Sequence, residues 1–144
     1  MFAAYRNPAR TYAGVAVETS VAGARPIDLV VMLYEGACEG IIKAVAHMQE
    51  GNIAAKGETI TKVIRIIDEG LKASLDPRGG EISGNLRGLY DYMTHRLLLG
   101  SLRNDPALLE EVRALLVDLK GAWDEIARAP RPGVDMPAVP RPQA

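Results

Sequence analysis

The sequence predicts an all-α protein: an antiparallel four-helix bundle between an N-terminal cap segment and a disordered, proline-rich C-terminal tail. Apolar residues recur at steps of three and four along four segments, each about 20 to 25 residues long. Proline, glycine or asparagine separates each segment from the next. Short turns between helices of this length favour an up-down-up-down arrangement, and no stretch alternates with the period of two that a strand requires.

The first helix is expected over residues 26–50, because Pro26 suits a first helical turn and Gly51 is a typical stop signal. The second helix is expected over residues 52–75, with Asn52 as its N-cap. Proline and two consecutive glycines then break the chain, because neither residue type supports the continuation of a helix.

The third helix is expected over residues 82–102, with Ser83 as a candidate cap. Asp105 is then expected to cap a fourth helix that starts at Pro106 and runs to residue 128. Aspartate followed by proline is a common helix start, because the side chain accepts a backbone hydrogen bond and proline needs no partner there.

Three parts are therefore expected along the chain: an N-terminal cap segment at 1–24, a four-helix bundle domain at 25–128, and a tail at 129–144. The tail contains five prolines, and proline at that density blocks both helix and sheet. We therefore expect the tail to be extended and disordered.

Composition excludes several classes of protein. The net charge is −1 and no run of Lys and Arg occurs, whereas a nucleic-acid-binding protein normally carries a basic stripe. No stretch approaches the roughly 18 apolar residues of a membrane span, and the N-terminus lacks the apolar core of a signal peptide. We therefore expect a cytoplasmic protein with no nucleic-acid partner and no membrane insertion. The single cysteine, Cys38, lies among apolar residues and is expected to be a packed thiol.

The sequence shows no pattern for catalysis. Neither His47 nor His95 has a glutamate three residues before it, as a di-iron helical bundle would require. CxxC, HExxH, a phosphate-binding glycine loop and a GxSxG nucleophile motif are all absent from the sequence. We therefore expect no catalytic, metal-binding or cofactor-binding residues and interpret the protein as non-enzymatic.

The third helix is apolar on more than one side. Tyr92, Leu98, Leu99 and Leu102 lie off the stripe that faces the expected core, and Ile66 does so more mildly on the second helix. We expect these shoulders of two antiparallel neighbours to frame a groove that contains Ile66, Tyr92 and Leu99. A partner helix would fill such a groove, and the alternatives are that the N-terminal segment or a second subunit covers it.

Several motifs occur in the order and spacing of a known family. The first helix reads Leu-Val-Val-Met-Leu-Tyr-Glu-Gly-Ala over residues 29–37, and the third reads Leu-Tyr-Asp-Tyr-Met over residues 89–93, followed by Arg96-Leu97. Further matching segments are 62–71, 74–76, 79–82, Asn85-Leu86, Glu111-Val112 and Ala122-Trp123. On these motifs the chain resembles the FliS family of flagellar secretion chaperones over about residues 12–127. It departs from the family pattern at Gly70, where leucine is common, and at Gly100-Ser101, where Ala-Asn is frequent.

The resemblance implies a cytosolic chaperone of bacterial flagellum assembly. Such a chaperone binds the disordered C-terminal segment of flagellin in hydrophobic grooves and prevents premature polymerisation. The chaperone–client complex then reaches the gate of the flagellar type III export apparatus. Combining the resemblance with the helix faces, we expect a partner-binding groove at Ile66, Ala73, Leu89, Tyr92, Arg96 and Leu99. Tyr5 and Tyr12 are expected in an N-terminal cap over that surface, with family support only for the region of Tyr12.

Two alternatives remain at this point. The apolar shoulders would equally serve a self-associating helical module, structural or regulatory, that forms a homodimer. A small bundle enzyme with an unrecognised site is the other alternative.

Overall fold

Local signals at both ends define the first helix, α2 (Pro26–Glu50), in a computed structural model that describes residues 25–129. Pro26 occupies the first helical position, and Asp28 closes a capping box with Arg25. Gly51 ends the helix in the left-handed conformation, at φ 74°, which glycine adopts without steric cost. The expected first helix is therefore confirmed at both ends.

The second helix is divided. Helix α3 (Ile53–Arg65) begins as expected, because the side chain of Asn52 accepts a hydrogen bond from the backbone N–H of Ala55 at 3.2 Å. A π-helix, η1 (Ile66–Lys72), then continues it, and the chain turns after Ala73. The expectation of one regular helix over 52–75 is therefore wrong in its last part, because a π-segment accommodates extra residues per turn while still burying apolar side chains.

A short 3₁₀ turn, η2 (Pro77–Gly79), leads into α4 (Gly80–Arg103). Ser83 does not cap α4, contrary to expectation. Its Oγ instead donates a hydrogen bond to the carbonyl oxygen of Asp76 at 2.7 Å, which fixes the approach of the chain to the helix. Helix α4 starts at Gly80, two residues earlier than the apolar pattern indicates. Gly80 has φ 62° and ψ −129°, a conformation open essentially only to glycine.

Helix α5 (Pro106–Arg128) starts and ends where expected. The side chain of Asp105 accepts a hydrogen bond from the backbone N–H of Ala107 at 3.0 Å, and Pro106 occupies the first turn. Asn104, at φ 53°, closes the preceding helix in the left-handed conformation.

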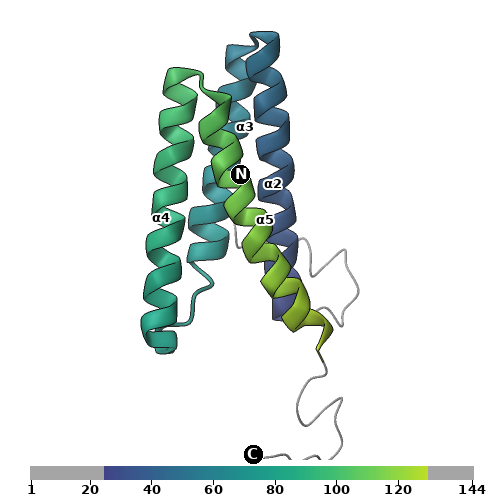
Figure 1. Ribbon diagram of the computed structural model, residues 1–144, viewed down its shortest axis with the longest axis vertical. Coiled ribbons are helices and arrows are strands. Elements are labelled where there is room, and N and C mark those ends of the chain that lie inside the picture. The colour runs from purple at the N-terminus through teal and green to yellow at the C-terminus, as the bar shows by residue number, and fades with distance from the viewer. Residues whose placement is uncertain (1–24, 130–144) are drawn as a thin grey trace, which may run out of the picture.

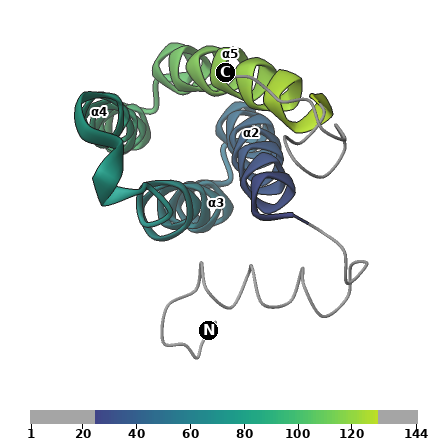
Figure 2. The same cartoon turned by 90° about the horizontal axis from the view of Figure 1, so that it is seen from below.

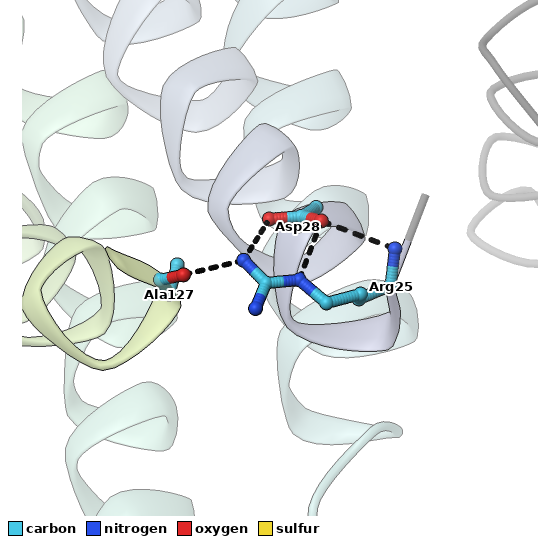
Figure 3. Close-up of polar contacts among 3 residues, drawn as sticks. All are labelled: Arg25, Asp28 and Ala127. Carbon is cyan, nitrogen blue, oxygen red and sulfur yellow. Dashed lines mark hydrogen bonds and ion pairs between the residues drawn. The ribbon is translucent and has the colours of Figure 1, made fainter. Parts of the chain in front are cut away.

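The helices run up and down in alternation and surround one core in the order α2, α3, α4, α5 (Figures 1 and 2). No strand occurs within residues 25–129, and the expected antiparallel four-helix bundle is confirmed. Helix α5 runs obliquely, from beside the end of α4 to beside the start of α2 (Figure 1). There the guanidinium of Arg25 donates to the carboxylate of Asp28 and to the carbonyl oxygen of Ala127, joining α2 to α5 (Figure 3).

The core is aliphatic with a small aromatic centre. All four helices and η1 contribute fully buried side chains, among them Tyr34, Ile41, Val63, Ile67, Leu71, Tyr90, Met93, Leu97, Leu109, Val112 and Leu116. Cys38 is half-buried against this core, and burial is the main reason that the pKa of its thiol is raised. The expected packed thiol is thereby confirmed. The expected N-terminal cap and the proline-rich tail lie outside the described residues, apart from Ala129.

Candidate functional site

Among the described helices, α4 leaves the most large apolar side chains in solvent. The exposed fraction is 71% for Ile82, 42% for Tyr92, 58% for Leu98 and 84% for Leu102. The opposite face of the same helix is buried, as Leu97 shows with no exposed surface. The third helix therefore carries apolar surface outside the core, as its sequence predicts, and such surface on a soluble protein is typical of a partner-binding region.

Four of the six residues expected in the partner groove share one flank of α4. Leu89, Tyr92, Arg96 and Leu99 follow one another at steps of three, four and three residues, which keeps them on one side of a helix. Tyr92 and Arg96 both bond to Glu111 of α5, so this flank faces α5. We call these five residues the α4–α5 seam.

Glu111 joins the two polar side chains of the seam. The hydroxyl of Tyr92 donates a hydrogen bond to Oε2 of Glu111, and Nε of Arg96 donates to Oε1 at 2.9 Å. The guanidinium carbon of Arg96 lies 5.7 Å from the centroid of the Tyr92 ring, within the range of a cation–π interaction. The shared hydrogen bond raises the pKa of Tyr92 and lowers the pKa of Glu111, because it favours the carboxylate and the protonated phenol.

The opposite flank of α4 faces α3 and η1 and carries polar contacts. Nζ of Lys72 lies 2.6 Å from Oδ1 of Asp91. Lys56 is buried, and its Nζ donates to the carbonyl oxygen of Ser101 at 3.0 Å and to Oδ1 of Asn104 at 3.1 Å. A lysine is well suited to this place, because the last carbonyl groups of a helix lack backbone partners and carry partial negative charge.

The structure therefore separates residues that the sequence placed together. Ile66 begins η1 and is half-buried against the core, whereas Ala73 follows η1 and is exposed. Both belong to the segment 66–73, which we call the η1 arm. This segment packs against the flank of α4 that faces away from α5 (Figure 2). The expected groove between the second and third helices is thus wrong in its placement of Tyr92 and Leu99, which belong to the seam with α5. A helical wheel gives the angle of a side chain from the core but not which neighbour lies on that side.

Two tyrosines and two histidines named in the sequence analysis remain to be located. Tyr5 and Tyr12 lie outside the described residues. His95 is exposed, and His47 lies half-buried in the last turn of α2, with Nδ1 at 3.8 Å from the carboxylate of Glu50. Within residues 25–129 no cluster of three or more His, Cys, Asp or Glu could hold a metal ion, and no helix there is long and apolar enough to cross a membrane.

Glu111 was not among the residues that the sequence singled out as a site, because it reads as part of the charged face of the fourth helix. Two signals in the sequence point to it: the family-matching pair Glu111-Val112, and its spacing from the apolar stripe. Glu111 lies three residues after Leu108 and four before Leu115, two half-buried side chains on the apolar stripe, so it borders that stripe. Which helix it faces follows only from the tertiary arrangement.

Comparison with known proteins decides the family. The model of the family described as flagellar protein FliS matches residues 8–130, which is most of the chain. The chain belongs to the FliS family. The resemblance carried by the motifs of the first and third helices is thereby confirmed over almost the same range.

Relatives of known role support the assignment to FliS. The flagellar secretion chaperone FliS of Salmonella typhimurium is 47% identical over 119 residues, which cover 82% of this chain and 88% of that protein. The protein of the same name in Escherichia coli is 40% identical over 122 residues, covering 84% and 90%. That of Bacillus subtilis is 32% identical over 128 residues, covering 89% and 92%. FliS is a chaperone family, so the chain is a flagellar secretion chaperone and not an enzyme.

Proposed function

We propose that this chaperone binds the disordered C-terminal segment of flagellin in the bacterial cytosol and prevents it from polymerising before export. The bound client is then delivered to the gate of the flagellar type III export apparatus. The observation that supports a client of this kind is the apolar surface of α4, where Tyr92, Leu98 and Leu102 are between 42% and 84% exposed. The choice of flagellin rests on the family resemblance.

The energetics favour an extended apolar surface over a small pocket. A disordered client must become ordered on binding, which costs several kcal/mol, so the interface has to bury a large apolar area in compensation. An amphipathic client helix lying along α4 would meet side chains at steps of three, four and seven residues, and the seam has this spacing. The exposed leucines on the outer side of α4 extend the same surface.

The client-contact residues that we propose lie in two places. Leu89, Tyr92, Arg96 and Leu99 form the α4 side of the seam, while Ile66 and Ala73 lie on the η1 arm. Because these two regions flank α4 on opposite sides, a client that contacts both has to pass across the helix. Leu98 and Leu102 lie on the outer surface between the two flanks. A wrapping client therefore fits the surface better than one straight helix in one groove.

Isothermal titration calorimetry with a synthetic flagellin C-terminal segment tests the proposal. The variant Tyr92→Ala removes an exposed aromatic ring from the seam, and Ile42→Ala removes an exposed apolar side chain from α2, where no client contact is proposed. We expect Tyr92→Ala to weaken binding about tenfold or more, as truncation of an aromatic anchor does, and Ile42→Ala to leave it unchanged. Circular dichroism should show both variants folded.

Two results would overturn the proposal. The first is the absence of measurable binding of the segment to the unchanged chain. The second is a stable dimer in light scattering that persists with the segment present and is broken by Tyr92→Ala. The dimer result would favour the self-associating module over the chaperone of flagellin.

A further inference from the structure

We infer that Glu111 is a positioning residue for client binding: it holds Tyr92 and Arg96 of α4 in place across the α4–α5 seam. This inference rests on the proposed function. It assigns a role to a residue of α5 that contacts two side chains of the client-binding surface on α4. Each oxygen of its carboxylate accepts one of the two seam donors, the hydroxyl of Tyr92 and Nε of Arg96.

The two side chains need such a support because both are partly exposed to solvent. Tyr92 is 42% exposed, and the side chain of Arg96 retains 29% of its accessible surface. An exposed arginine samples many rotamers, and fixing it on binding costs affinity. Here Glu111 fixes Nε, while the guanidinium lies 5.7 Å from the centre of the Tyr92 ring. The three side chains thereby restrict one another before any client arrives.

Tyrosine and arginine are also among the residue types that most often dominate binding energy at interfaces. In the seam they are flanked along α4 by Leu89 and Leu99, three residues before Tyr92 and three after Arg96. An aromatic ring and a guanidinium held between two leucines match the usual anchor of an interface, apolar around a few fixed polar groups. Arg96 has no other hydrogen bond or ion pair among the described residues, so its position depends on Glu111.

The alternative is a latch, in which the same two hydrogen bonds close the seam and must break for the client to enter. The two ideas predict opposite signs. A positioning residue strengthens client binding, so its removal weakens binding, whereas removal of a latch strengthens it. The exposure of Tyr92 favours positioning, because a latch that covers a groove is expected to bury its own ring.

The chain offers a matched control. Glu110, the preceding residue, makes the same type of bond within α5, from Nε of Arg113 to its Oε1 at 2.9 Å. It has no hydrogen bond or ion pair to α4 among the described residues. Glu110→Gln and Glu111→Gln therefore remove equal charge from the same helix, but only Glu111→Gln removes a carboxylate from the seam.

The experiment measures the affinity of the synthetic flagellin C-terminal segment for these variants by calorimetry. We expect Glu111→Gln to weaken binding about two- to fivefold, the range that an exposed ion pair spans, and Glu110→Gln to leave it unchanged. The effect of Glu111→Gln should disappear in the double background Tyr92→Phe/Arg96→Ala, because the residue acts through those two side chains. Chemical unfolding should show equal midpoints for the two glutamate variants.

Three results would overturn the inference. Binding by Glu111→Gln that equals or exceeds that of the unchanged chain would exclude positioning, and tighter binding would indicate the latch. An equal loss in Glu110→Gln would indicate a general effect of charge. An undiminished loss in the double background would show that Glu111 acts by another route. In each case the unchanged chain still binds the segment, so these results differ from a failure of the proposed function.

Discussion

Three aromatic side chains place hydrogen bonds at the centre of an otherwise aliphatic core. Nε1 of Trp123 on α5 donates to the hydroxyl of Tyr34 on α2 at 3.1 Å, and that hydroxyl shares a hydrogen bond with the hydroxyl of Tyr90 on α4. Tyr34 and Tyr90 are fully buried, so neither hydroxyl has water as an alternative partner. Because a buried polar group without a partner is costly, this network favours one arrangement of three helices over its alternatives.

The same network makes the bundle sensitive to alkaline pH. Burial is the main cause that raises the pKa of both Tyr34 and Tyr90, since a phenolate is poorly solvated inside the core. The pKa of each tyrosine is about 10 in the unfolded chain and higher in the folded chain. The corresponding contribution to stability is fully present below about pH 10, because both forms of the chain are then protonated. It is lost as pH rises above that value, because the unfolded chain then loses its protons first. We therefore expect the free energy of unfolding to fall as pH increases beyond about 10.

Urea unfolding across this pH range, followed by circular dichroism, checks the prediction. The double variant Tyr34→Phe/Tyr90→Phe is the control, because it retains the lysines that titrate in the same range. Its stability at neutral pH should be lower, and its stability should change less between neutral and alkaline pH. An equally steep alkaline loss in the variant would assign the effect to other groups.

At the scale of the helices, one glycine sets how closely α2 and α3 approach. A Cβ atom added at Gly40 would lie 2.5 Å from Cγ2 of Val63, a buried residue of α3. Gly57, on α3 itself, has no atom within 4 Å of such a Cβ. Gly40 therefore permits the close packing of two helices, whereas Gly57 only lowers the stability of its own helix.

The same substitution, glycine to alanine, is therefore expected to change the stability of the bundle in opposite directions at the two positions. Gly40→Ala should destabilise the bundle by about 1–3 kcal/mol, as overpacking does, because Val63 has to move within a filled core. Gly57→Ala should stabilise it by up to about 1 kcal/mol, because alanine is the better helix former. Urea denaturation midpoints measure both, and stabilisation by Gly40→Ala would show that the two helices are not in close contact there.

Several helix ends could be predicted from the sequence because their signals are local. Asn52, Asp105 and the proline after it specify helix starts through bonds within one turn, and the structure places those starts where expected. The π-segment Ile66–Lys72 could not be predicted, since an α-helix and a π-helix tolerate the same order of apolar residues. On α4, Leu86 and Leu89 are half-buried at the edge of the core.

The candidate site was predicted less completely, for a geometrical reason. The spacing of Leu89, Tyr92, Arg96 and Leu99 shows from the sequence that they share a flank of the third helix. Whether that flank faces the second or the fourth helix depends on the handedness of the bundle, which no single helix encodes. Glu111 was not assigned to the site for the same reason, because its partners lie on another helix.

At the scale of the molecule, the fold and the binding surface use different faces of α4. Its inner face supplies Tyr90, Met93 and Leu97 to the core, each at most 1% exposed. Its outer face carries Leu98 and Leu102 in solvent. A chaperone needs this separation, since it has to remain folded both before a client binds and after the client is released.

Two adjacent leucines allow this separation to be measured. Leu97 is fully buried and Leu98 is 58% exposed, yet both lie within α4, so replacement by alanine changes helix propensity equally. In urea unfolding, Leu97→Ala should cost about 2–5 kcal/mol, because it removes buried methyl groups and leaves a cavity. Leu98→Ala should stay within about 0.5 kcal/mol of the unchanged chain, as surface substitutions usually do. A similar cost at both positions would mean that the outer face of α4 is part of the fold, and that surface would then no longer be available for a client.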